Sequence, residues 1–175
     1  MKKFKTTDLN RKDIDAFKSA KKIPVCVVLD NVRSLLNVGS IFRTCDAFLI
    51  EKIWLCGITG QPPHREIQKS ALGATESMDW GYVEDIAVLA GKLKAEGYKM
   101  IGIEQTDKSI LLNEFKILEN EKYALVFGNE VDGISDELLP YLDQAIEIPQ
   151  QGIKHSLNVS VAAGIVVYRF FENNS

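Results

Sequence analysis

The run from Val25 to Leu29 places the strongest constraint on the fold of this chain. It holds five consecutive apolar residues and is bounded by Pro24 and Asp30. Runs of this kind, without polar alternation, are typical of strands covered on both faces, which occur mainly in parallel sheets. A second run, 52–56, has the same character. The sequence therefore predicts an α/β protein with a mainly parallel sheet and helices on both faces.

Strand and helix patterns alternate along the rest of the chain. A helix is predicted from about Asn37, where apolar residues recur at helical spacing up to Phe48 or Leu49. Further strands are predicted over 78–83, 98–103, 123–127 and 144–148, and further helices within 7–20, over 65–72 and 85–96, from Ser135, and from 156–160 to about Phe171. Such alternation predicts an α/β fold on a mainly parallel sheet, and 175 residues suffice for one ordinary domain.

The composition is that of a soluble globular protein, with 46% hydrophobic and 26% charged residues. The apolar run 159–168 is half the length needed to cross a bilayer, and no signal-peptide pattern is visible. Cys26, Cys45 and Cys56 lie in apolar stretches without CxxC spacing. They are predicted to be reduced core thiols, and the chain is predicted to be cytoplasmic, with no membrane contact.

Residues 1–22 are basic in a chain whose net charge is −3. They contain eight lysines and arginines against three aspartates, and therefore carry a net charge of +5. A basic arm of this kind can neutralise RNA phosphates locally, although the whole chain is acidic. A solvated basic helix without any RNA contact explains the same charges equally well.

Three polar loops follow predicted strands, namely Asp30 to Asn37, Phe127 to Gly133, and Pro149 to Asn158. Ligands of parallel sheets bind beyond the carboxyl ends of the strands, so these loops are predicted to form one site. The last loop leads into Ser156, Asn158 and Ser160, whose oxygens could equally cap the first turn of a buried helix.

Several kinds of site are disfavoured by what the sequence lacks. Neither a GxGxxG fingerprint nor a GxxxxGK[ST] phosphate loop is present. His64 and His155 lack metal-ligand spacing, so no metal is predicted. His155 precedes Ser156, but no GxSxG elbow surrounds this pair. Residues 129–132 resemble only a fragment of a calcium loop.

The remaining motifs occur in a definite order. They are Asn37-x-Gly39-x-x-x-Arg43-Thr44, then Phe127-Gly128-Asn129-Glu130-x-x-Gly133-Ile134-Ser135, then Ile148-Pro149 followed by Ser156-Leu157-Asn158-Val159-Ser160-Val161-Ala162. In this order and spacing they resemble the SpoU/TrmH family of RNA ribose 2′-O-methyltransferases, which are α/β-knot proteins. The resemblance extends from about Val25 to Phe170.

This resemblance implies a fold and an activity. It implies a single domain with a Rossmann-like sheet, whose core, 24–171, ends in a C-terminal trefoil knot that binds S-adenosylmethionine. It also implies a homodimer that uses the last helix, and RNA as substrate. The segment Ser156 to Ala162 most resembles the tRNA enzymes that act on the D-loop guanosine, although those extend past their last core helix, whereas this sequence stops at Ser175. An rRNA substrate is the alternative.

Residue roles also follow from the resemblance. Arg43 corresponds to the catalytic arginine. The other polar motif residues are Asn37, Glu130, Ser156 and Asn158, and the positions near the cofactor are Glu104, Gly128, Ile148 and Leu157. A guanidinium, with a pKa above about 12, is a poor base. We therefore expect Arg43 to hold the adjacent phosphate and to stabilise the forming alkoxide.

Other interpretations of the same residues are open. Arg43 could form a helix ion pair with Asp46, and Glu130 could merely cap the backbone amides that follow it in the chain. A non-catalytic RNA-binding protein on the same fold would belong to a different functional class. An unrelated nucleotide-binding α/β enzyme is disfavoured because the chain has no phosphate loop.

Overall fold

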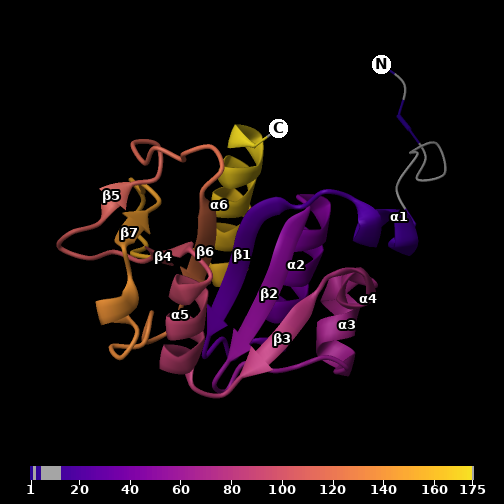
Figure 1. Ribbon diagram of the computed structural model, residues 1–175, viewed down its shortest axis with the longest axis horizontal. Coiled ribbons are helices and arrows are strands. Elements are labelled where there is room, and N and C mark those ends of the chain that lie inside the picture. Colours follow the sequence, from indigo (N-terminus) through magenta and orange to yellow (C-terminus); the bar gives the residue numbers. More distant parts are fainter. Residues whose placement is uncertain (2, 5–12, 175) are drawn as a thin grey trace.

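The computed structural model describes residues 1, 3–4 and 13–174, and its centre is one seven-stranded sheet (Figure 1). The strands lie in the order β3-β2-β1-β6-β4-β7-β5, and every neighbouring pair is parallel. Their bounds are β1 Ile23–Asp30, β2 Ile50–Cys56, β3 Trp80–Val83, β4 Tyr98–Ile103, β5 Ile110–Leu111, β6 Lys122–Phe127 and β7 Gln144–Glu147. The predicted parallel α/β sheet is confirmed.

Helices cover both faces of the sheet. The bounds are α1 Ile14–Ser19, α2 Leu35–Ala47, α3 Arg65–Ala71, α4 Ala74–Ser77, α5 Ile86–Ala95 and α6 Val159–Asn173, with a 3₁₀ turn, η2, at Leu139–Tyr141. Helices α2 and α6 contribute to the hydrophobic core on one face, and α5 contributes to the core on the other. Figure 1 shows α3 and α4 beside α2. None of the described helices is long and apolar enough to span a bilayer.

Strand β1 lies at the centre of both cores. Val25, Val27 and Leu29 pack against the α2–α6 side, and Cys26 and Val28 pack against the α5 side. This alternation follows from the two-residue period of a strand, and it explains why the run contains no polar residue.

The three cysteines are buried and free of disulfides, as the sequence predicts. Desolvation by burial raises the pKa of each thiol, for Cys56 to about 12. The thiols therefore stay protonated at neutral pH, and they behave as small apolar groups of the core.

Some predicted boundaries were wrong. Helix α2 begins at Leu35, two residues before Asn37, because Ser34 is the N-cap and accepts a hydrogen bond from the Asn37 amide. No helix begins at Ser135, whose amide and hydroxyl instead donate to Asp30. Strand β3 starts at Trp80 instead of residue 78.

Other elements were missed or fall partly outside the described residues. The short helix α4 was missed; it is separated from α3 by Gly73, whose φ is +91°. The two-residue strand β5 was missed as well. Of the helix predicted within 7–20, α1 is the described part, and residues 7–12 lie outside the described residues.

Candidate active site

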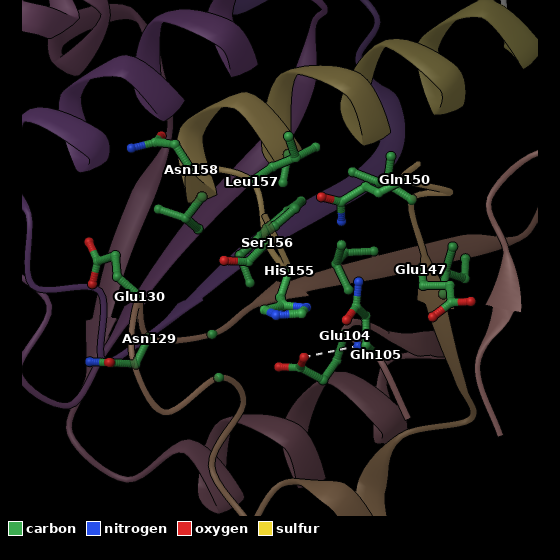
Figure 2. Close-up of a pocket in the computed structure, with 18 of the residues that line it drawn as sticks. Glu104, Gln105, Asn129, Glu130, Glu147, Gln150, His155, Ser156, Leu157 and Asn158 are labelled. Carbon is green, nitrogen blue, oxygen red and sulfur yellow. Dashed lines mark hydrogen bonds between the residues drawn. The ribbon is translucent and has the colours of Figure 1, made fainter. Parts of the chain in front are cut away.

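A cavity of about 380 Å³ lies beyond the carboxyl ends of β4, β6 and β7, beside the first turn of α6 (Figure 2). Segments far apart in the chain meet there. Its lining comes from 103–105, 127–131, Gly133, 146–148, Gln150, 155–159 and Ala162. The cavity therefore occupies the place where parallel sheets bind ligands. All four positions predicted to lie near a cofactor, Glu104, Gly128, Ile148 and Leu157, line it.

One wall is a tight turn after β6. The amide of Asn129 donates to the Gly133 carbonyl at 2.8 Å, and the amide of Gly133 donates back at 3.0 Å. A Cβ atom at Gly128 would collide with the Gly133 backbone, and the φ of Gly133 is +73°. Both positions therefore require glycine.

Glu104 fixes the floor of the cavity. Its Oε2 accepts from the Ile134 amide at 3.1 Å, and its Oε1 accepts from the Gln105 amide at 2.9 Å. A Cβ atom at Gly133 would run into this carboxylate. Glu104 therefore joins the end of β4 to the turn after β6, a structural contact in addition to any contact with a ligand.

A chain of polar side chains connects the three motifs. The Asn37 Nδ2 donates to Glu130 Oε1 at 3.1 Å, and the Asn158 Nδ2 donates to Asn37 Oδ1, also at 3.1 Å. These residues belong to α2, to the turn after β6 and to the N-cap of α6. The three loops predicted to form one site therefore do meet.

Glu130 also caps α2. Its carboxylate accepts from the amides of Arg33 and Ser34, at 3.0 Å each. Partial burial opposes the charge, but these hydrogen bonds outweigh it and lower the pKa of Glu130 below its usual value. The carboxylate thus fills the N-terminus of α2, the position where such helices often bind phosphate. The predicted capping of the amides that follow Glu130 was wrong, because the Val131 and Asp132 amides donate to Asn129 Oδ1 instead.

Asn158 has two structural roles. Its Oδ1 accepts from the amide and the hydroxyl of Ser160, at 2.9 and 2.6 Å, and caps α6, while its amide nitrogen bonds Asn37. The helix-cap interpretation is therefore confirmed for Asn158, which also lines the cavity, and its part in a reaction stays a prediction. Ser156 lines the cavity, and its hydroxyl makes no hydrogen bond to the described part of the chain.

Arg43 lies apart from these residues. Its side chain is exposed on α2 and does not line the cavity. Its guanidinium forms no ion pair or hydrogen bond with any described residue. The alternative pairing with Asp46 is not formed; the Asp46 carboxylate instead accepts from the Ser77 hydroxyl at 2.5 Å.

The cavity contains polar residues that the sequence prediction did not assign to the site. Asn129, His155, Gln105, Gln150 and Glu147 all line it (Figure 2). The first two stand inside or beside the motifs, and the other three lie at or just beyond the ends of β4 and β7. Among the described residues, the lining includes three carboxylates, those of Glu147 and of the predicted Glu104 and Glu130, and no lysine or arginine. Its charge therefore favours a cationic ligand.

Comparisons with known proteins agree with this geometry. Residues 24–168 match the model of the SpoU rRNA Methylase family. A protein of Aquifex aeolicus named tRNA (guanosine(18)-2′-O)-methyltransferase is 32% identical over 148 residues, which cover 81% of this chain and 66% of that protein. The crystal structure of an A. aeolicus TrmH/SpoU tRNA modifying enzyme has a TM-score of 0.81 at 26% identity, and the match covers 92% of this chain and 82% of that one.

A third comparison concerns a structure with a bound ligand. The AdoMet-bound rRNA methyltransferase of Sinorhizobium meliloti has a TM-score of 0.80 at 24% identity, covering 90% of this chain and 60% of that one. At this identity the likeness shows a shared fold. The chain spans 60% or less of the length of several curated relatives.

Proposed function

Because this chain belongs to the SpoU rRNA methylase family, we propose that it transfers a methyl group from S-adenosylmethionine to a ribose 2′-hydroxyl of RNA. The observation that carries the proposal is the hydrogen-bonded chain Glu130–Asn37–Asn158. It joins the α2 motif, which does not line the cavity, to the two motifs that do, beyond the carboxyl ends of the strands.

The cavity suits S-adenosylmethionine in size and in charge. A volume of about 380 Å³ lies within the range of about 300–1,000 Å³ for small-molecule sites. Apolar side chains such as Ile103, Phe127 and Leu157 offer surfaces for an adenine ring, and the carboxylates suit a cation. When bound, the cofactor supplies an electrophilic methyl group on a positively charged sulfur.

The residues around the cavity have distinct roles in this proposal. Gly128, Ile148 and Leu157 hold the cofactor beside the turn after β6. Ser156, whose hydroxyl no described residue engages, offers a hydrogen bond to a ligand. Glu130, Asn37 and Asn158 keep the loops in register. We propose that Arg43 holds the phosphate next to the reacting ribose and stabilises the forming alkoxide, a role that suits a planar guanidinium that cannot lose its proton.

We also propose a homodimer. Val161, Ile165 and Tyr168 recur at helical spacing on α6, and their side chains are 50%, 40% and 49% exposed. On the same side of the sheet, Leu36 and Arg43 lie on the exposed face of α2. A second copy that covered this apolar stripe would come close to Arg43. We propose as well that the C-terminal part of the chain forms the trefoil knot expected from the resemblance.

Replacing an apolar residue of this stripe tests the dimer. Val161→Glu should convert a dimer to a monomer in size-exclusion chromatography with light scattering, because a charge would be buried at the interface. Val88→Glu is a matched control, since Val88 is 65% exposed on α5, the helix on the opposite face of the sheet. A wild-type chain that is monomeric at high concentration would contradict the proposal.

We propose that the substrate is tRNA rather than rRNA and that the D-loop guanosine is the favoured nucleotide. We also propose that the protein acts in the cytoplasm. The Ser156–Ala162 segment and the Aquifex relative support this choice. The basic N-terminal residues 1–22 would contact phosphates. Deletion of residues 1–12 should weaken RNA binding and flatten its salt dependence. Unchanged affinity and slope would refute the arm's role.

Two measurements test the activity. Isothermal titration calorimetry should detect S-adenosylmethionine binding, and a tRNA transcript should gain one 2′-O-methyl group that mass spectrometry can map. A chain that binds RNA but fails to bind the cofactor at millimolar concentration would instead be a non-catalytic RNA-binding protein. Methylation of rRNA fragments alone would identify the alternative substrate.

A further inference from the structure

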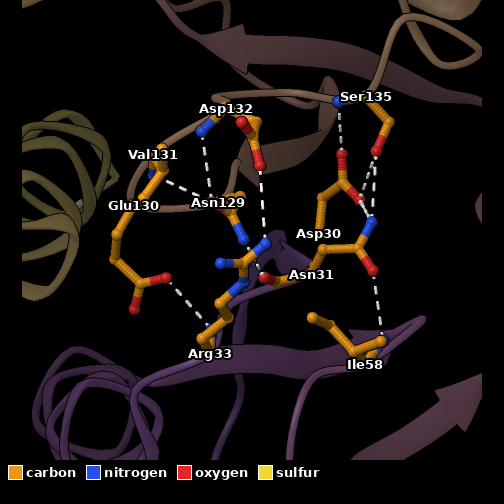
Figure 3. Close-up of polar contacts among 9 residues, drawn as sticks. All are labelled: Asp30, Asn31, Arg33, Ile58, Asn129, Glu130, Val131, Asp132 and Ser135. Carbon is orange, nitrogen blue, oxygen red and sulfur yellow. Dashed lines mark hydrogen bonds and ion pairs between the residues drawn. The ribbon is translucent and has the colours of Figure 1, made fainter.

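Asp30, the last residue of β1, is a fully buried carboxylate with no part in the proposed chemistry. Burying a charge is costly unless hydrogen bonds compensate it. Asp30 forms no ion pair with any described residue. Three donors compensate it instead (Figure 3): Asn31 Nδ2 at 2.8 Å, the Ser135 amide at 2.7 Å and the Ser135 hydroxyl at 2.9 Å.

The neighbouring Asn31 is held in one orientation. Its Oδ1 accepts from the Ile58 amide at 3.1 Å, so its Nδ2 must face Asp30 and Ser135. Its φ is +54°, and its carbonyl accepts from Asn129 Nδ2 at 2.7 Å. Asp30 and Asn31 together therefore connect the ends of β1, β2 and β6.

These bonds anchor the turn after β6 at both ends. Asn129 is tied to Asn31 at one end, and Ser135 is tied to Asp30 at the other. Between these anchors lie Glu130, which caps α2, and Gly133, which forms part of the cavity wall.

We infer that Asp30 is a positioning residue for the cofactor site: its carboxylate holds the 129–135 turn in the conformation that shapes the cavity and places Glu130 against α2. This rests on the proposed function, because the cavity is taken to bind S-adenosylmethionine. Asp30 itself does not line the cavity, so it acts only through Ser135 and Asn31.

Asp30→Asn tests the inference with little change in shape. The introduced amide nitrogen would face the Asn31 Nδ2 or the Ser135 amide, both of which are donors, and Asn31 cannot turn because of Ile58. We expect the dissociation constant for S-adenosylmethionine, measured by calorimetry, to rise roughly tenfold. Hydrogen exchange of the amides in 129–135 should become faster, with or without the cofactor.

A matched control separates positioning from general stability. Asp85 also accepts backbone hydrogen bonds, from Ala87 and Val88 at the start of α5, but it does not line the cavity. Asp85→Ala, which removes this cap, should lower the melting temperature and leave the cofactor affinity unchanged. Ser135→Ala removes the hydroxyl that donates to Asp30 and accepts from Asn31 Nδ2, and it keeps the amide bond to Asp30. It serves if Asp30→Asn fails to fold, and it should weaken cofactor binding about threefold.

The outcomes distinguish the inference from the proposed function. If wild type does not bind the cofactor, the proposed function fails, and the exchange rates of 129–135 still test the anchoring. If wild type binds and the folded Asp30 or Ser135 variants bind equally well, the inference is overturned. It is also overturned if the Asp85 control loses as much affinity as the Asp30 variant.

Discussion

The two ends of α2 contrast sharply, although the same motif places a predicted catalytic residue at each. Near the N-terminus, Asn37 is held between Glu130 and Asn158. Two turns later, Arg43 is exposed and contacts no described polar group. A residue whose hydrogen bonds are all used within the protein is suited to positioning. A residue whose donors are all free is suited to a partner outside the chain.

This contrast separates two kinds of effect. Changes near Asn37 should alter stability and loop geometry together, because each side chain there joins two or three segments. A change at Arg43 should alter activity and leave stability intact. Variants near Asn37 can therefore test the positioning role, and variants at Arg43 can separately test the role in activity.

The largest effect is expected at Arg43. Arg43→Ala should lower kcat/KM for RNA methylation by roughly 100- to 1,000-fold, the cost of losing one donor to a developing oxyanion. Its melting temperature should not change, because the side chain is exposed and pairs with no described residue. Single-turnover methylation and calorimetric melting measure the two quantities.

Two companion variants sharpen the Arg43 prediction. Arg43→Lys keeps the charge but loses the planar fork, and it should remain strongly impaired. If it retained most activity, bidentate phosphate binding would be ruled out. Arg65→Ala removes another exposed arginine, at the start of α3, and should be nearly neutral.

Glu130→Gln should destabilise the protein by about 1–2 kcal/mol at pH 7, because one of its two accepting oxygens becomes a donor facing the Arg33 or Ser34 amide. Urea unfolding measures the loss. Glu114→Gln is the control, since Glu114 is exposed and its carboxylate makes no hydrogen bond in the described structure.

The difference in unfolding free energy between wild type and Glu130→Gln should depend on pH, because the pKa of Glu130 is lowered in the folded protein. A carboxyl whose folded pKa is depressed stabilises the fold above its unfolded pKa, about 4.3 for glutamate, and loses that contribution as the pH falls through the folded value. The difference between wild type and Glu130→Gln should therefore be full at pH 7 and shrink below about pH 4. A difference that grew on acidification would contradict the cap.

The sheet and most helices were predictable because their signals are local. The apolar run 25–29 shows a strand buried on both faces, and Asp85 and Gly97 delimit α5. The start of α2 was missed because its cap depends on Ser34 together with Glu130, a residue almost a hundred positions away. A helix was wrongly predicted from Ser135 because its capping oxygen is engaged by Asp30.

The candidate site shows the same limit. Asn37, Glu130 and Asn158 could be singled out by motif, and the cofactor positions Gly128 and Leu157 do line one cavity. No local pattern indicates that the three polar residues bond one another, or that Arg43 does not line the cavity. Those facts depend on how distant loops meet at the sheet edge. From the sequence, Asp30 marks only the end of a strand, because its partners lie in another loop.

The smallest effect is expected at Asn158, where two roles can be separated. Asn158→Ala should cost about 1 kcal/mol of stability, because the Ser160 amide loses its cap. Asn158→Asp keeps the capping oxygen but loses the donor to Asn37, so stability should be retained while cofactor affinity falls. Urea unfolding and calorimetry measure the two effects. If both variants lost only stability, the Asn37–Asn158 bond would be a by-product of helix capping. The N-terminal end of α2 would then have no part in shaping the site.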